Sequence, residues 1–168
     1  MTISMYQVSV PVFARNLSAL LGILGKAEAF AEARKIDQTV LLNTRLFPDM
    51  FAFNVQVGQV CTHATRAVSH LAGVTQPDYG QPDTTFAALK DRVSKALAFV
   101  NEFKPEQIDG TEDKDIVLKF GTREMPFKGQ AFLVGFSLTN FFFHYTTAYN
   151  ILRSMGLEVG KRDFMGPA

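Results

Sequence analysis

The chain contains no tryptophan and one cysteine, Cys61, among its 168 residues. A single cysteine cannot form a disulfide within the chain, which fits a reducing compartment, and we expect a cytoplasmic protein. The sequence also lacks an excess of charge of one sign, because 17 Lys and Arg face 16 Asp and Glu for a net charge of +1. No basic excess favours nucleic acid or an anionic membrane, so we expect neither as a partner.

Several catalytic motifs are missing as well. The sequence has no Cys-x-x-Cys, no His-Glu-x-x-His, no Gly-rich phosphate loop and no Gly-x-Ser-x-Gly turn. These spacings mark common thiol, zinc, nucleotide and serine-hydrolase sites. Nothing in the sequence therefore requires a cofactor, and whether the chain is an enzyme stays open.

Hydrophobic residues make up 47% of the chain, and 16 of them are Phe. A chain of this length buries roughly 70% of its unfolded surface, which is enough for a core without disulfides. The length is that of one typical domain. We therefore predict a single domain over residues 1–168.

Apolar residues at helical spacing predict four helices, over about residues 4–34, 48–71, 84–104 and 130–155. Pro11 belongs in a first turn, Pro48 and Asp49 suit a helix start, and Gly73 suits a helix end. Residues 115–128 alternate around Gly121 and predict a β-hairpin, and residues 157–168 form a tail. Four helices with one long connection that holds a hairpin predict an all-α four-helix bundle.

Residues 129–152 contain no charged side chain, and 24 residues are long enough to cross a bilayer. Ten of these positions are polar or half-polar, which hydrocarbon does not accommodate well. We therefore expect the fourth helix to lie buried in the core, apolar nearly all round.

Four polar side chains lie on one stripe of this buried helix, at spacings of three, four and three: Ser137, Asn140, His144 and Thr147. Buried polar groups need hydrogen-bond partners, so the stripe indicates a structural network or the lining of a ligand pocket. His144 is the candidate catalytic residue, because imidazole binds metals and transfers protons near neutral pH.

The second helix carries a polar stripe at intervals of seven: Asp49, Gln56, His63 and His70. One interpretation is the solvated face of an amphipathic helix. The other is that its N-terminal half, with Asp49, Gln56 and Gln59, turns into the bundle opposite His144. His63 and His70 lie about 10 Å apart along the helix and cannot share one ion.

Three segments carry a resemblance to a known family: Arg45–Met50, Phe143–Arg153 and Gly160–Phe164. Together they resemble an uncharacterised bacterial family of the DinB/YfiT-like metalloenzyme superfamily. The resemblance covers nearly the whole chain and implies an up-down-down-up four-helix bundle, often a homodimer. It also implies a divalent metal held by one His of the second helix and a His-x3-His pair of the last.

The chain departs from that metal pattern. If His144 is the first His of the pair, Ala148 stands at the second position; if it is the second, Asn140 stands at the first. On the second helix the expected position falls near Gln56 or Gln59. Catalytic zinc normally needs three protein ligands, so we predict a degraded metal site.

Three functions follow as hypotheses. The first is a small-molecule pocket between the second and fourth helices, lined by Asp49, Gln56, Gln59, Asn140 and Thr147, with His144 as general base or hydrogen-bond donor. The second is a divergent metal site of His144 with Gln59 and Asn140, whose oxygen ligands favour Mn²⁺ or Mg²⁺. The third is a non-catalytic homodimer that associates through its many Phe side chains.

Overall fold

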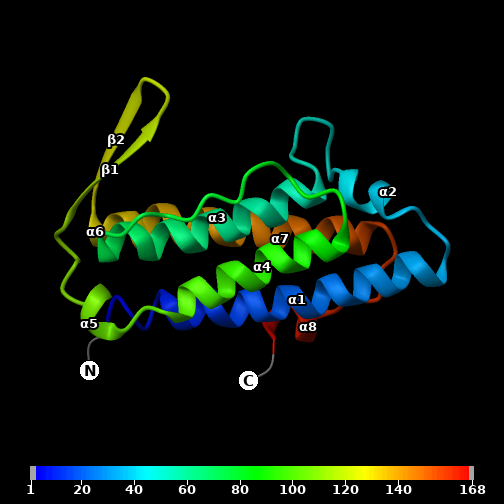
Figure 1. Ribbon diagram of the computed structural model, residues 1–168, viewed down its shortest axis with the longest axis horizontal. Helices are drawn as coiled ribbons and strands as arrows, with labels where there is room; N and C mark the ends of the chain where they lie inside the picture. Colours follow the sequence, from blue (N-terminus) through cyan, green and yellow to red (C-terminus); the bar gives the residue numbers. More distant parts are fainter. Residues whose placement is uncertain (1–2, 167–168) are drawn as a thin grey trace.

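In a computed structural model, which describes residues 3–166, four long helices lie side by side (Figure 1). They are α1 (Val10–Ala33), α3 (Phe53–Ala72), α4 (Phe86–Asn101) and α7 (Leu138–Ser154). An antiparallel hairpin of β1 (Asp115–Phe120) and β2 (Arg123–Lys128) projects from one end of the bundle. The prediction of a mostly helical chain with a small hairpin is confirmed, although residues 1–2 and the end of the tail, 167–168, lie outside the described residues.

The last long helix is buried on one side only, so the prediction of a rod covered on most sides is wrong: exposed positions recur along its other side, among them Phe143, Thr146 and Arg153. Phe141 and Tyr145 of α7 are fully buried, and Phe141 packs edge-on against Phe13 of α1 with ring centroids 5.0 Å apart. Within residues 3–166, no helix combines the length and apolar character needed to cross a membrane. The buried side of α7 thus packs against other helices of the same chain, and the charged residue of α7, Arg153, is exposed.

The second long helix begins at Phe53, five residues later than the sequence pattern suggests. Residues 45–52 form a loop that stands out from the bundle between α2 (Gln38–Asn43) and α3 (Figure 1). The Phe53 amide donates to the Thr44 carbonyl at 2.9 Å, and the Arg45 guanidinium donates to the Met50 carbonyl. Because the loop satisfies these polar groups itself, Pro48 and Asp49 lie outside the helix.

The last helical rod starts with α6 (Gly129–Ala131) and continues as a π-helical segment, η1 (Phe132–Ser137), into α7. The sequence pattern predicts the rod but not its π-helical part. Gly129 is required at the start, because a β-carbon there would lie 1.9 Å from the Thr111 carbonyl oxygen. This close approach fixes the hairpin connection against the first turn of the rod.

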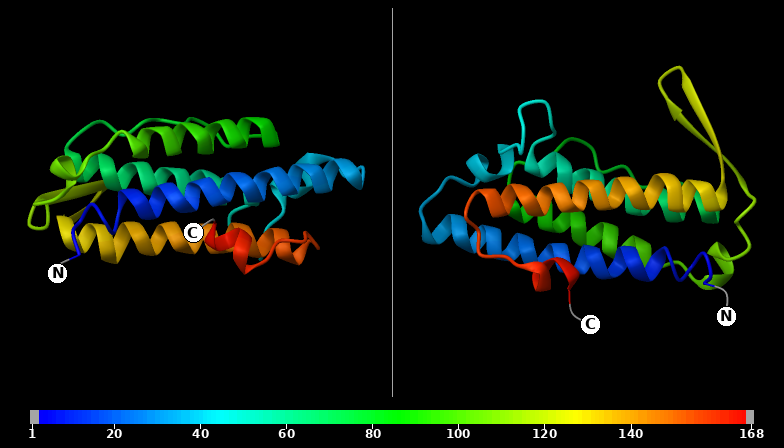
Figure 2. Two further views of the ribbon diagram at one scale, coloured as in Figure 1. Left: turned by 90° about the horizontal axis from the view of Figure 1, so that it is seen from below. Right: turned by 180° about the vertical axis from the view of Figure 1, so that it is seen from behind.

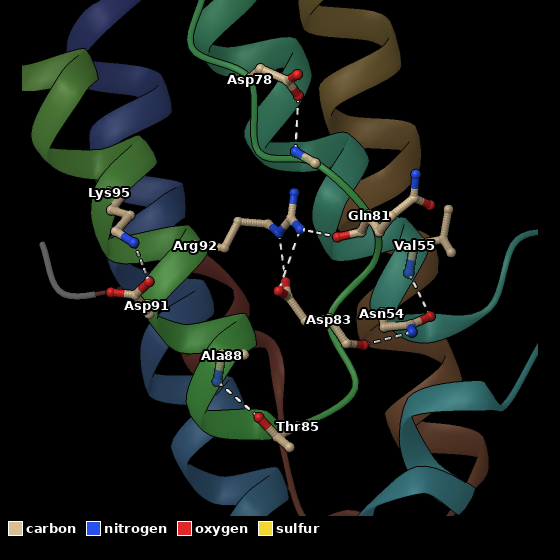
Figure 3. A network of polar contacts seen from close by, with 11 residues as sticks. Asn54, Val55, Asp78, Gln81, Asp83, Thr85, Ala88, Asp91, Arg92 and Lys95 are labelled. Atoms are coloured by element: carbon tan, nitrogen blue, oxygen red, sulfur yellow. Dashed lines mark hydrogen bonds and ion pairs between the residues drawn. The ribbon is translucent and has the colours of Figure 1, made fainter.

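The connection from α3 to α4 is held by a buried arginine (Figure 3). Arg92 of α4 bonds through Nε to Asp83 Oδ2 at 2.5 Å, and its Nη2 donates to the Gln81 carbonyl. Asn54 of α3 donates to the Asp83 carbonyl at 2.8 Å. One buried ion pair therefore joins the loop to both helices.

Two short helices complete the described part of the chain. They are α5 (Pro105–Ile108), before the hairpin, and α8 (Lys161–Met165), which lies in the predicted tail. The ring of Phe164 in α8 stacks on Tyr145 of α7 with centroids 4.4 Å apart. The tail is thus packed against the bundle along 161–165.

Replacing Arg92 by Met should lower the free energy of unfolding by about 3 kcal/mol, because the Asp83 carboxylate loses its buried partner. Urea denaturation at pH 7 measures the change. The matched control is Lys95→Met, also on α4, whose pair with Asp91 is exposed and should cost less than about 1 kcal/mol. Equal losses in the two variants would contradict this account.

Candidate functional site

Two histidines meet between α3 and α7. The rings of His63 from α3 and His144 from α7 are stacked, with centroids 5.5 Å apart and planes inclined by 17°. Both residues are buried, with exposed fractions of 4% and 7%. We call His63 and His144 the imidazole pair.

A chain of hydrogen bonds orients the His144 ring. The amide nitrogen of Gln56 donates to the Phe51 carbonyl at 3.1 Å, which turns the Gln56 oxygen toward His144 Nδ1 at 2.7 Å. Since that oxygen can only accept, Nδ1 carries the proton and Nε2 carries a lone pair. His144 is thus held in one tautomer with Nε2 as its basic atom.

His63 is less well satisfied. Its Nδ1 is buried and has no hydrogen-bond partner among residues 3–166, and the same holds for the Ser137 hydroxyl at the end of η1. The centroid of the His63 ring lies 5.8 Å from that of Phe136, which is also in η1. Buried polar atoms without partners are rare in folded proteins and mark positions where a hydrogen-bonding group would be stabilised.

Burial keeps both imidazoles neutral. It lowers the pKa of His63 to about 3, with smaller contributions from the positive charges of Arg66 and His144. It also lowers the pKa of His144 to about 4. At pH 7 neither ring is cationic, so each offers a lone pair that can accept a proton or a hydrogen bond.

Aromatic side chains flank His144 at the protein surface. The Phe51 ring, from the 45–52 loop, stacks with the His144 ring at a centroid distance of 6.3 Å, and Phe143 meets it edge-on at 5.2 Å. Phe51 and Phe143 are about half exposed, at 50% and 56%. The imidazole pair therefore lies beneath an apolar part of the surface.

The other candidate residues are distributed around this pair. Thr147 is buried and donates to the Phe143 carbonyl at 2.7 Å, and half-buried Asn140 donates to the Phe136 carbonyl at 2.7 Å. Gln59 is half-buried, and no hydrogen bond within the described chain joins it to either imidazole. Asp49 lies exposed in the 45–52 loop, away from any helix.

The solvated-face interpretation of the second-helix stripe is wrong for Gln56 and His63, which are buried at 1% and 4% exposure. The sequence reasoning therefore missed His63 as a neighbour of His144. The signal was present in the spacing, because His63 lies seven residues after Gln56 and thus on the same side of the helix.

The low pKa values of the imidazole pair predict a loss of stability in acid. The unfolded chain takes up these protons near pH 6.5, whereas the folded chain does so only near pH 3 to 4. The unfolded state binds more protons between these values, so the free energy of unfolding should fall from pH 7 to pH 5, by on the order of 1 kcal/mol per imidazole for each pH unit below 6.5.

Urea denaturation at pH 7 and pH 5 measures this change, and His63→Phe should reduce it. Imidazole NMR signals, assigned with His70→Asn, provide the direct check. A His63 or His144 signal that titrates near pH 6.5 would contradict the burial argument.

Comparison with known proteins identifies the family. Residues 5–165 match the family model of a domain of unknown function, DUF1993. The chain is similar to a crystal structure described as a DinB family member protein from Shewanella denitrificans, with 35% identity and a TM-score of 0.86. The match covers 97% of this chain and 92% of that one. No curated protein matches. The chain therefore belongs to the DUF1993 family, and its fold is DinB-like.

Proposed function

We propose that the interface of α3 and α7 binds a small polar molecule and that His144 accepts a hydrogen bond or a proton from it. The observation that supports this function is the imidazole pair, two neutral stacked rings, one of them held in a single tautomer by Gln56. A fixed neutral imidazole is the usual general base for O–H, S–H and N–H groups.

The predicted lining residues have separate roles in this proposal. Gln56 positions His144 and does not itself contact the ligand. Asn140 lies one helical turn before His144, and because its amide nitrogen donates to the backbone, its side-chain oxygen is left as an acceptor. Thr147 and Gln59 would line the ends of the site, and Asp49 would approach only from the 45–52 loop.

The metal site of the DinB/YfiT-like superfamily does not fit the residues present. That pattern needs three imidazoles, and α3 and α7 bring together two. Among residues 3–166 no group of three or more His, Cys, Asp and Glu side chains is placed to hold a metal ion. The proposed role of His144 therefore rests on its neutral imidazole as a hydrogen-bond acceptor.

A divergent metal site is the second candidate, favoured by the unpartnered Nδ1 of His63. The predicted ligands are His144 with Gln59 and Asn140, but His63 is the α3 side chain whose ring contacts His144. Two imidazole nitrogens favour Zn²⁺ or Ni²⁺ over the Mn²⁺ or Mg²⁺ that oxygen ligands alone would prefer. Elemental analysis of protein purified without a His tag tests this candidate, and a metal content near zero removes it.

Thermal-shift measurements test the site with four probes: reduced glutathione, Zn²⁺, Ni²⁺ and Mn²⁺. At least one probe should raise the melting temperature of the wild type, because a ligand that binds only the folded state stabilises it. His144→Ala should abolish that rise. The control His70→Ala, on α3 outside the imidazole pair, should retain it. If no probe shifts the wild type, or if His144→Ala responds equally, the proposal is wrong.

We also propose that the bundle has the up-down-down-up order and that the chain forms a homodimer. The order is supported by the colour progression in Figures 1 and 2, where α1 and α7 lead away from the hairpin end and α3 and α4 lead toward it. The homodimer is supported by three exposed rings, Phe47, Phe51 and Phe143. Exposed aromatic rings of this kind can pair with those of a second copy.

Light scattering after size exclusion should give twice the monomer mass for the wild type. Phe143→Glu should give the monomer, because it would bury a carboxylate in the interface. Lys95→Glu changes an exposed side chain of α4 and is the control. This variant should remain dimeric. A wild type that stays monomeric at its highest attainable concentration contradicts the homodimer.

A further inference from the structure

A hollow lies between α1 and α8. Helix α8 lies on the side of the bundle opposite the hairpin and the 45–52 loop (Figures 1 and 2). Its volume is about 770 Å³, within the range of small-molecule pockets. Ser18, Gly22 and Ile23 of α1 form its floor, and Lys161, Arg162 and Met165 of α8 form one wall. None of these residues belongs to the site proposed above.

The wall is fixed before any ligand arrives. The Tyr145 hydroxyl donates to the Phe164 carbonyl at 2.7 Å, and the two rings stack. Lys26 of α1 pairs with Asp163 of α8 at 2.6 Å, and Asp163 also accepts from the Gly160 amide at 2.8 Å. The hollow is therefore held by contacts from α1 and α7, and little ordering would accompany binding.

The floor contains a glycine in the interior of α1. Glycine there destabilises the helix relative to alanine, yet a β-carbon at Gly22 would meet no atom within 4 Å. No packing within the described chain requires glycine at this position. The absent side chain leaves the surface of α1 open to a molecule lying along it.

The charges of the wall are unbalanced. Lys161 and Arg162 are exposed, and neither has a carboxylate at ion-pair distance among residues 3–166. Lys26 is neutralised by Asp163. Two unpaired cations thus border a floor of Ser18, Gly22 and Ile23, with Ala19 also lining the hollow.

We propose that this hollow binds a small amphipathic carboxylate, whose apolar chain lies over Gly22 and Ile23 and whose carboxylate faces Lys161 and Arg162. A cation pair beside apolar surface selects an anion with an apolar body over an inorganic anion or a neutral lipid-like molecule. This site is independent of the imidazole pair and does not rest on the proposed function.

Titration of the full chain with octanoate, followed by ¹H–¹⁵N NMR, tests the proposal. Octanoate should shift the Gly22, Gly160 and Gly166 amides saturably. Lys161→Gln combined with Arg162→Gln should weaken octanoate binding at least about threefold, as expected for two solvent-exposed charge contacts. Binding of 1-octanol, which lacks the charge, should not respond to that double variant.

A matched pair of variants separates the hollow from general surface binding. Gly22→Leu fills the floor and should abolish octanoate binding. Gly25→Leu adds the same side chain to the same helix, at a position that also has no atom within 4 Å but does not line the hollow, and should leave binding intact. Equal effects of the two variants, shifts confined to residues outside α1 and α8, or no saturable shift would each overturn the proposal.

Discussion

The burial of two neutral imidazoles between α3 and α7 is the constraint on which the site depends. Burial favours the uncharged ring so strongly that the pKa of His144 falls to about 4 and that of His63 to about 3. A charged group beside them would have to be desolvated at a cost of several kcal/mol. The run without charged side chains over residues 129–152 is consistent with this cost.

The two imidazoles differ in their hydrogen bonding: His144 Nδ1 has a partner and His63 Nδ1 has none within residues 3–166. His144 has a partner in Gln56, which is itself held by the Phe51 carbonyl, so loop and helix together orient one imidazole. His63 Nδ1 and the Ser137 hydroxyl have no such partners within residues 3–166. A network serving only stability would be expected to satisfy all of these atoms, because each buried orphan costs about 1–3 kcal/mol.

The sequence predicts the helical fold and the hairpin because these depend on local rules. Apolar spacing marks the long helices, and the Gly121 turn separates two short strands. The predicted helix start at Pro48 and Asp49 was wrong, because these residues suit a loop as well as they suit a helix start. The ends of that loop are joined by the hydrogen bond from the Phe53 amide to the Thr44 carbonyl. His63 was missed because a polar stripe alone does not show whether it faces water or another helix. That distinction depends on tertiary packing, which places Gln56 and His63 against α7.

Helix α7 packs against α3 through His144 and against α8 through Tyr145. Successive residues His144 and Tyr145 point to different neighbours, His144 to His63 on α3 and Tyr145 to Phe164 on α8. Both are buried, so neither side of the rod can carry a charge without a partner. The exposed residues on either side of this pair, Phe143 and Thr146, are also uncharged, although a charged side chain could be solvated there. Burial within the chain explains why His144 and Tyr145 are not replaced by charged residues, but it does not explain the uncharged residues Phe143 and Thr146.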